Sequence, residues 1–481
     1  MKVTKLKNTL LNPRMVRALY SMGKKIIVVS GLPGGGKTRS TMEVVSTLKN
    51  KVKIVYASPL RRLREYVARQ YDGFELKSKT EVCHKLYDIE EEKLSHVQYL
   101  IKVFKRCSEC NEESSKCPFK STLKDFISAK NGLWCMTFRM LYIISAYCYD
   151  AFKNVILVID EAENWLDLFD LVMTEKELQT LRIMAKNDTH VAKIIKKILS
   201  LTIKLGNRFG YYFLKPHIPL ARLIFLVSAT LPDDFLALFP FPSNEVYIPR
   251  NMQYSSDVEE LIEREKEYTI FRVVISSDVK DEFYLYPRKC SWMGTVDGYE
   301  PREKWIPKII KLIDKYYDEG LSIGVASRNY ALTKIITGEL MSQGYKCYSD
   351  IVQDKPPRYA EVNPPYVMIW TTRGRWYRGV SLPDTDIIIC TYQSAIDKIP
   401  NLSVYRAFEM DIKYAPLMNY CVNTQSYYRS NRMRSKQHKV VFLDLRAWWA
   451  TKTALKHYSN CRWFAKMKSP EVIRSDFWKN L

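Results

Sequence analysis

The segment that most constrains the fold is 31–38, which reads Gly-Leu-Pro-Gly-Gly-Gly-Lys-Thr and matches the phosphate-binding loop pattern. An apolar, β-branched run at 24–30 precedes it, and a helix-like segment at 38–49 follows it. In such a loop, glycines let backbone N–H groups curl around phosphates, and the helix N-terminus adds positive potential. The competing interpretation is a glycine-rich turn with a chance lysine, and the flanking strand and helix argue against it. The segment therefore predicts ATP binding and hydrolysis.

The residues of this loop have separate expected roles. Lys37 is expected to hold the β- and γ-phosphates, and the Thr38 hydroxyl is expected to ligate Mg²⁺. The predicted ligands are thus ATP and Mg²⁺. The glycines expected to line the phosphates are Gly31, Gly34, Gly35 and Gly36.

Two later strand ends carry polar residues suited to the same site. Asp160 and Glu161 follow the apolar run 155–159. Asp160 is expected to hold Mg²⁺ through water, and Glu161 to orient and deprotonate the attacking water. An ordinary acidic strand end is the alternative. The triplet Ser-Ala-Thr at 228–230 follows the run 223–227 and is a candidate for coupling the γ-phosphate site to nucleic-acid binding, although such a triplet alone indicates only a strand end.

A basic segment near the C-terminus offers groups that could complete the site. Residues 425–434 read Gln-Ser-Tyr-Tyr-Arg-Ser-Asn-Arg-Met-Arg. On a helix, Arg429 and Arg432 lie one turn apart on the same face. They are candidate arginine fingers from a second domain, and Gln425 is a candidate nucleotide-binding residue. The alternative is a basic helix that faces solvent or nucleic acid.

Strands alternate with helices in two separate parts of the chain, which predicts an α/β fold with a doubly wound parallel sheet in each part. Two stretches, 75–134 and 164–220, interrupt the first part, and the second of them is helical and lysine-rich. The boundary between the two parts is expected within 235–300. The strands are predicted at 24–30, 52–57, 155–159 and 223–227, then at 321–326, 366–371, 386–391 and 439–444.

These patterns give a predicted domain organisation. The chain of 481 residues is too long for one compact core. The first domain is expected to comprise 1–74, 135–163 and 221–240, and the second 241–481. The two interrupting stretches are expected to be insertions on the first.

The charge of the chain points to a polyanionic partner. The net charge is +23, from 75 basic and 52 acidic residues. Nucleic acid is the favoured partner, with anionic membranes or acidic proteins as alternatives. Some of the 32 tyrosines, 19 phenylalanines and 10 tryptophans could stack on unpaired bases. The sequence has no apolar run long enough to span a membrane and no secretion signal, so we expect a cytoplasmic protein.

The 11 cysteines fall into two groups. Seven are scattered and fit small buried apolar side chains. The other four form a cluster in a polar segment, where free thiols would be exposed and oxidisable. Four thiolates suit zinc or an iron–sulfur cluster, and neutral buried thiols are the alternative. Cys135 is the substitute ligand if Cys83 is not one. The clustered cysteines are Cys83, Cys107, Cys110 and Cys117.

The order of these motifs resembles the XPD/DinG-type superfamily 2 DNA helicases, over roughly 24–235 and 300–450. The Cys-x-x-Cys pair followed by Cys-Pro-aromatic, between loop and Asp-Glu-Ala, is the most discriminating part. The resemblance implies two RecA-like motor domains, a 4Fe–4S cluster on the four cysteines of insert 75–134, and a short arch-like domain at 164–220. It further implies a monomer that moves 5′ to 3′ on single-stranded DNA, opens forked DNA, and works with accessory proteins.

The chain departs from the family at three positions. Glu163 stands where the family has His, and Arg378 and Ser381 stand where it has Glu and Asp. A glutamine-bearing adenine motif before residue 31 is not evident. These changes favour altered contacts with nucleic acid or altered communication between domains. Two other functions therefore remain open: a translocase or remodeller that does not unwind, and a zinc-bearing nucleic-acid-binding module with a vestigial ATPase.

Overall fold

The computed structural model describes the parts of the chain that form two parallel sheets and a smaller antiparallel one. The described residues are 3–6, 11–23, 25–30, 36–86, 96–110, 116–162, 172–186, 190–200, 202–205, 211–214, 219, 221–228, 245–249, 269–274, 305–327, 330–371, 376, 382–392, 430, 438–442 and 471–473.

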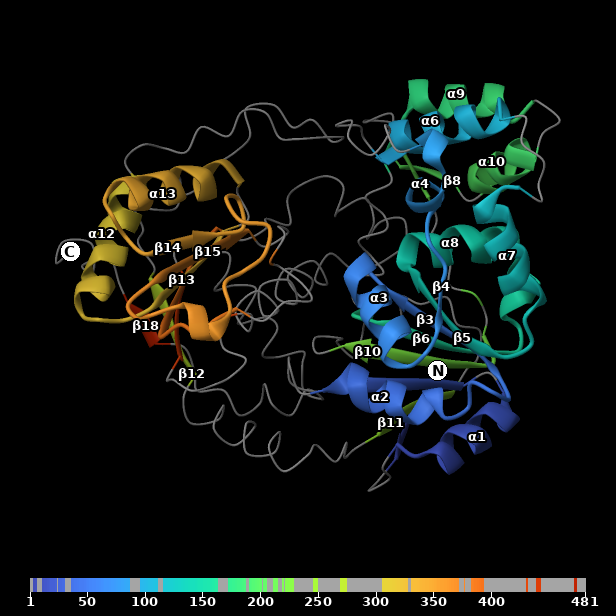
Figure 1. Ribbon diagram of the computed structural model, residues 1–481, viewed down its shortest axis with the longest axis horizontal. Helices are drawn as coiled ribbons and strands as arrows, with labels where there is room; N and C mark the ends of the chain where they lie inside the picture. Colours follow the sequence, from blue (N-terminus) through green and yellow to red (C-terminus); the bar gives the residue numbers. More distant parts are fainter. Residues whose placement is uncertain are drawn as a thin grey trace.

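The first sheet has eight strands, and every strand pair in it is parallel. It lies on the right of Figure 1. Its central strands are continuous apolar runs, as expected for a sheet covered on both faces. In spatial order the strands are β1 (Val3–Leu6), β11 (Glu245–Pro249), β2 (Lys25–Ser30), β10 (Leu223–Ser228), β6 (Val155–Asp160), β3 (Lys53–Ser58), β5 (Gly132–Thr137) and β4 (Phe74–Glu75).

Side chains alternate between two cores on the two faces of this sheet. Within β2, Ile27 and Val29 join one buried cluster, while Ile26 and Val28 join the other. This period of two is what an extended strand dictates. The first face is covered by α1 (Pro13–Met22), α2 (Lys37–Ser46) and α3 (Arg61–Gln70), and the second by α7 (Pro118–Ser128), η2 (Tyr149–Phe152) and α8 (Phe138–Tyr147).

Helices from the two interrupting stretches pack together rather than standing apart. Helix α6 contacts both α9 and α10, and α10 also contacts α8 of the sheet layer. Figure 1 shows these helices together above the first sheet, and we call this group the cap. The cap comprises α4 (Lys79–Val82), η1 (His84–Leu86), α6 (His96–Ser108), α9 (Glu175–Met184), α10 (His190–Ser200) and the antiparallel strands β7 (Val172–Thr174), β9 (Tyr211–Leu214) and β8 (Thr202–Leu205).

The second sheet has seven strands, also paired in parallel. Gly324 in its centre is required by packing, because a Cβ there would lie 2.7 Å from the ring of the buried Trp370. Helices α12 (Trp305–Asp318) and α13 (Tyr330–Ser342) contribute to its core, and η6 (Tyr359–Glu361) lies in a connection. The strand order is β14 (Cys347–Ser349), β15 (Val367–Thr371), β13 (Ile323–Ser327), β16 (Ile387–Tyr392), β17 (His438–Phe442), β12 (Thr269–Val274) and β18 (Glu471–Ile473).

The predicted fold class is confirmed: the chain is α/β with two parallel sheets, and all eight predicted strands are present. The interval 235–300 holds two further strands that the sequence did not reveal. Strand β11 belongs to the first sheet although it follows residue 240, and β12 belongs to the second. Strand β5 begins inside the stretch 75–134 and pairs with β3. The exact domain limits stay predictions. Within the described parts of the chain, no helix has the length and apolar character needed to cross a bilayer.

Candidate active site

The candidate site lies at the carboxyl edge of the first sheet. The parallel register places Ser30 of β2 beside Ser228 of β10, and Asp160 of β6 beside Val227. Strand β3 pairs with β6 and ends at Ser58 on the same edge. Loops that follow parallel strands meet at such an edge, which is where open α/β sheets bind ligands. The sheet thus gathers segments that are more than a hundred residues apart in the sequence.

The start of α2 has the backbone geometry that a phosphate loop needs. Gly36 is the N-cap, with φ 75 and ψ 13 in the left-handed region that glycine adopts without strain. Its carbonyl accepts a hydrogen bond from the Ser40 N–H at 2.9 Å, so the helix continues directly from it. Lys37 is the first helical residue and is only 8% exposed. Gly31, Gly34 and Gly35 lie outside the described residues.

Asp160 is the centre of a buried hydrogen-bond cluster. The Thr38 hydroxyl donates to its Oδ1 at 2.8 Å, and the Tyr56 hydroxyl donates to its Oδ2 at 2.7 Å. The backbone N–H of Glu161 also donates to Oδ1, at 3.1 Å. The two predicted Mg²⁺ ligands, Thr38 and Asp160, are therefore in direct contact although 122 positions separate them.

The electrostatics of Asp160 suit a site that receives a cation. Burial, together with the charge of the neighbouring Glu161, raises the pKa of this carboxyl to about 6. Hydrogen bonds from Tyr56 and Thr38, and the charge of Lys37, act in the opposite direction without cancelling burial. An oxygen pair from a hydroxyl and a carboxylate is a donor set that Mg²⁺ uses beside phosphates. The residues present therefore fit a Mg²⁺ site.

Glu161 has an unusual backbone conformation. Its φ is 54, in the left-handed region that non-glycine residues rarely adopt. The next residue, Ala162, is fully buried in the core beneath the cap. Strained residues of this kind collect at functional sites, where the surrounding structure holds them in place. The turn after Asp160 is thus held in a strained conformation at the position predicted for the catalytic base.

Tyr56 is a site residue that the sequence did not single out. It is fully buried in β3, and its hydroxyl reaches across to Asp160 on β6. Burial, together with the charge of Asp160, raises the pKa of Tyr56 well above its usual value, so the phenol stays protonated and donates. A polar-tipped aromatic near the end of a buried strand was the available signal, since a buried tyrosine hydroxyl needs a partner.

The residues predicted to complete the site from the second domain are not described. Ser430 lies between the two candidate arginine fingers and is buried. Its backbone carbonyl accepts from the Thr385 N–H at 2.8 Å, which ties this point to the chain entering β16. Gln425, Arg429, Arg432, Glu163, Arg378 and Ser381 lie outside the described residues, as do positions 229 and 230 of the Ser-Ala-Thr triplet.

The four clustered cysteines lie at the base of the cap. Cys83 follows α4, Cys107 lies in α6, Cys110 lies just beyond it, and Cys117 is the N-cap of α7. All four are free thiols that are neither fully buried nor fully exposed. The described part of the chain contains no group of three potential ligands close enough together to hold a metal ion. The donor types suit a cysteine-ligated centre, but the structure does not present them as a closed cage.

The surroundings of these cysteines are electropositive. The Lys79 ammonium donates to the Cys107 Sγ at 3.6 Å, and the Lys85 ammonium donates to the Cys110 Sγ at 3.7 Å. Burial raises the pKa of the Cys107 thiol, and Lys79 partly offsets this increase. Cys135 does not lie with them, because its side chain joins the buried cluster on the opposite face of the sheet. Cys135 is thus not placed to substitute for Cys83.

Comparisons with known proteins bear on the fold. No protein-family model matches the sequence, and no curated protein matches it. Among solved structures, S. tokodaii Xpd4 aligns with a TM-score of 0.51 and 12% identity, over 96% of this chain and 98% of that one. S. cerevisiae Dbp5 bound to RNA and ADP BeF3 aligns with a TM-score of 0.42 and 11% identity, over 95% and 87%. The helicase MrfA bound to DNA and AMPPNP aligns with a TM-score of 0.43 and 8% identity, over 96% of this chain and 51% of that one.

The similarity to Xpd4 extends over nearly the whole of both chains and shows a shared fold. The chain therefore shares with Xpd4 a fold built on two parallel, RecA-like sheets. An iron–sulfur assignment depends on the four cysteines and the resemblance of the motif order.

Proposed function

We propose that this protein is an ATP-driven motor of the superfamily 2 helicase type that acts on nucleic acid. The contact between Thr38 and Asp160, beside the first turn of α2, is the observation that carries the proposal. It unites the end of a phosphate loop with an acidic strand end, which is the arrangement that P-loop NTPases use for Mg²⁺ and the β/γ-phosphates. The two-domain fold supplies the second element that a motor needs.

The proposed mechanism assigns a task to each residue. Lys37 holds the β- and γ-phosphates, while Thr38 and Asp160 hold Mg²⁺, which neutralises charge developing on the phosphates. Glu161 orients a water molecule and accepts its proton, and Tyr56 keeps the Asp160 carboxylate oriented. Arg429 and Arg432 are proposed to reach the γ-phosphate from the second domain when the cleft closes. Hydrolysis then reopens the cleft and advances the bound strand.

The proposed substrate is single-stranded and forked DNA, with movement from 5′ to 3′. The net charge of +23 supports a polyanionic partner, because phosphate contacts by Lys and Arg dominate such affinity. The choice of DNA and the polarity come from the family that the motif order resembles. The proposed active species is a monomer in the cytoplasm, with accessory proteins as further partners.

We further propose that Cys83, Cys107, Cys110 and Cys117 hold a 4Fe–4S cluster, with a structural zinc ion as the alternative. Lys79 and Lys85 beside two of these sulfurs would balance the negative charge of thiolate ligands. Absorption spectra of anaerobically purified protein distinguish the two. Broad absorbance near about 400 nm is the expected result for iron–sulfur, while colourless protein containing one zinc per chain contradicts the cluster.

The test of the motor is strand displacement on duplexes that carry a 5′ or a 3′ overhang, in DNA and in RNA. The proposal predicts ATP-dependent displacement from 5′-overhang DNA and none by Lys37→Ala. Displacement only from 3′ overhangs or only from RNA contradicts the proposed polarity or substrate. Absence of ATP turnover on every nucleic acid contradicts the motor itself and favours a binding module with a vestigial ATPase.

A second candidate function is translocation without unwinding. Glu163, Arg378 and Ser381 replace the residues that the related helicases have at their coupling positions. Such a protein would hydrolyse ATP on single strands and displace bound proteins, but it would not separate duplexes. A streptavidin-displacement assay on end-biotinylated single strands, run beside the duplex assay, separates the two functions.

A further inference from the structure

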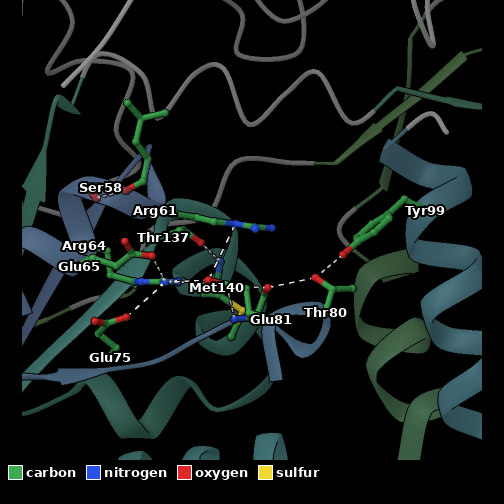
Figure 2. A network of polar contacts seen from close by, with 12 residues as sticks. Ser58, Arg61, Arg64, Glu65, Glu75, Thr80, Glu81, Tyr99, Thr137 and Met140 are labelled. Carbon is green, nitrogen blue, oxygen red and sulfur yellow. Dashed lines mark hydrogen bonds and ion pairs between the residues drawn. The ribbon is translucent and has the colours of Figure 1, made fainter. Parts of the chain in front are cut away.

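A buried arginine joins the first domain to the cap. Arg64 of α3 has a fully buried side chain, which is unusual for this residue type. It donates to both oxygens of Glu81, at 2.7 and 3.1 Å, in a bidentate ion pair. Its second guanidinium nitrogen also lies 3.3 Å from Glu65 and 3.4 Å from Glu75. Figure 2 shows the guanidinium surrounded by these three carboxylates.

Glu81 in turn organises the single helical turn α4. Its Oε2 accepts the backbone N–H and the hydroxyl of Ser78, each at 2.7 Å, which forms a capping box. Burial alone would raise the pKa of Glu81, but the hydrogen bonds from Arg64 and Ser78 outweigh it and lower the pKa to about 2. The carboxylate is therefore charged and fully engaged, with α3 on one side and the start of α4 on the other.

The remaining residues of α4 contact α6 of the cap and α7 of the sheet layer. The Lys79 ammonium donates to Cys107 on α6 and lies 5.3 Å from the ring of Phe119 on α7. The hydroxyl of Tyr99 on α6 donates to the buried Thr80 at 2.6 Å, at the right of Figure 2. Cys83 directly follows the turn, and its N–H donates to the Lys79 carbonyl at 2.8 Å. One turn therefore connects Arg64 with two of the clustered cysteines.

The same arginine is connected to the candidate nucleotide site. Tyr56 of β3 holds Asp160, and β3 ends two residues later at Ser58. The Ser58 hydroxyl donates to the Leu60 carbonyl at 3.1 Å, and the Arg64 N–H donates to the same carbonyl at 3.3 Å. A continuous series of hydrogen bonds and one short turn of backbone thus runs from the site into α3.

Stability alone does not account for such a pair. Burying two charges costs desolvation energy that their attraction repays only in good geometry, and apolar residues of similar size often serve stability as well. What a bidentate guanidinium–carboxylate pair provides is a fixed orientation between the groups that carry it. Here the two groups belong to the sheet domain and to the cysteine-bearing turn.

We propose that Arg64 is a positioning residue that couples the nucleotide site to the cysteine cluster through Glu81 and α4. Nucleotide bound at Lys37 and Asp160 restricts the motion of β3 and of the start of α3. Through Arg64 it also restricts the motion of the turn that ends at Cys83. This coupling rests on the proposed nucleotide site, while the anchoring of α4 by Arg64 stands independently of it.

Hydrogen exchange followed by mass spectrometry tests the proposal on the full chain. The peptide spanning 78–86 is followed with and without a non-hydrolysable ATP analogue and Mg²⁺. In the parental protein, nucleotide slows exchange in this peptide. Arg64→Met speeds its exchange by about tenfold or more and removes the nucleotide effect, whereas the exposed Arg69→Met on the same helix behaves like the parental protein. Arg64→Lys, which can reach only part of Glu81, gives an intermediate result.

Equal exchange in Arg64→Met and Arg69→Met overturns the proposal. Nucleotide binding is measured separately with a fluorescent ATP analogue. If nucleotide binds but the parental peptide does not respond, the coupling is wrong and the proposed function stands. If no nucleotide binds, the proposed function is wrong, and the comparison of Arg64→Met with Arg69→Met still decides the anchoring role. Should Arg64→Met fail to fold, Glu81→Gln preserves side-chain size and is expected to give the same loss of protection.

Discussion

Two carboxylates, the buried Asp160 of the first sheet and the partly buried Glu81 of the cap, have opposite electrostatic environments. Burial and Glu161 raise the pKa of Asp160 to about 6, whereas Arg64 and Ser78 overcome burial and lower that of Glu81 to about 2. Asp160 is held by neutral donors from Thr38, Tyr56 and a backbone N–H. Glu81 is held by a guanidinium at 2.7 Å.

The difference fits the two roles proposed for these carboxylates. Glu81 already has its cation within the chain, so its role is to fix one part of the protein against another. Asp160 has hydrogen bonds that orient it but too little positive charge to offset its burial, which is the condition of a ligand prepared for a cation from solution. Glu81 therefore fixes two parts of the fold against each other, whereas Asp160 is a candidate metal ligand.

The largest expected effect concerns the residue beside Asp160. Replacing Glu161 by Gln removes the proposed base but keeps its size, so ATP hydrolysis should fall by about 100-fold or more. ATP affinity should stay close to that of the parental protein, because Glu161 is not expected to hold phosphates. Steady-state hydrolysis and equilibrium nucleotide binding measure the two. Glu43→Gln on the exposed face of α2 is the control, and equal rates in both variants would remove Glu161 from the mechanism.

The next effect concerns the carboxylate that already has its cation. Glu81→Gln leaves the Arg64 guanidinium buried without its main partner and should lower the free energy of unfolding by about 3 kcal/mol. The matched control is Glu65→Gln, because Glu65 pairs with the same guanidinium at 3.3 Å but is 44% exposed. That variant should change the free energy by less than about 1 kcal/mol. Urea unfolding measures both, and equal losses would show that burial of the pair has no special role.

The corresponding substitution at the nucleotide site should change the free energy of unfolding in the opposite direction. Asp160→Asn removes a desolvated charge repelled by Glu161. The Asn Oδ1 can still accept from Thr38 and the Glu161 N–H, and its Nδ2 can donate to the Tyr56 hydroxyl, which donates to Asp160 in the parental protein. The ligand-free protein should become more stable by about 1 kcal/mol. Stabilisation by ATP with Mg²⁺, read as a shift in the thermal midpoint, should be lost. A destabilised ligand-free Asp160→Asn would mean that Asp160, like Glu81, already has the partner it needs.

The smallest expected effect concerns Lys53. It tests whether burying a charge without a charged partner lowers the stability of the fold at a second position in the domain. Lys53 is buried, and its ammonium donates to the backbone carbonyl of Phe126. The ammonium nitrogen also lies 3.8 Å from the centroid of the Phe126 ring. Burial lowers its pKa to about 8, with Cys148 opposing. Below pH 8 the lysine is charged in both the folded and the unfolded state, so the folded state carries the full cost of burying the charge. As pH rises from about 8 towards 10.5, the native state loses its proton first and stability increases.

Lys53→Met should therefore be slightly more stable than the parental protein at neutral pH, by less than about 1 kcal/mol. This advantage should shrink between pH 8 and 10.5, and chemical unfolding at several pH values measures it. Lys51→Met, an exposed neighbour, should show no such pH dependence relative to the parental protein. A constant difference between Lys53→Met and the parental protein across this range contradicts the lowered pKa.

Much of the fold followed from the sequence because buried parallel strands are continuous apolar runs. Segments such as 155–160 and 223–228 have this character, and their carboxyl ends had to meet at one edge. At that edge the Thr38 hydroxyl lies 2.8 Å from Asp160, while the roles of both residues stay predictions. Short strands such as β4, with two residues, and β11, which begins with Glu245, lack a readable pattern and depend on pairing partners far along the chain.

The residues that sequence reasoning missed act through tertiary contacts. Tyr56 resembles any core aromatic until β3 is placed beside β6, and Arg64 resembles its exposed neighbours in a basic helix until α4 packs on it. The packing of α6 against α9 was equally hidden, because it joins two stretches that are separated in the sequence by α7, β5, α8, η2 and β6 of the sheet domain. The roles of Arg429 and Arg432 stay predictions, since neither residue is among those described.

ATP hydrolysis by Lys37→Ala, measured with and without single-stranded DNA, tests most directly whether this protein is an ATP-driven motor. We expect the parental protein and the matched Lys51→Ala variant to hydrolyse ATP faster when DNA is present. Lys37→Ala should lose at least about 99% of this activity, because the β- and γ-phosphates lose their lysine. ATP turnover by Lys37→Ala at the parental rate would show that the site at Thr38 and Asp160 is not where this protein hydrolyses ATP.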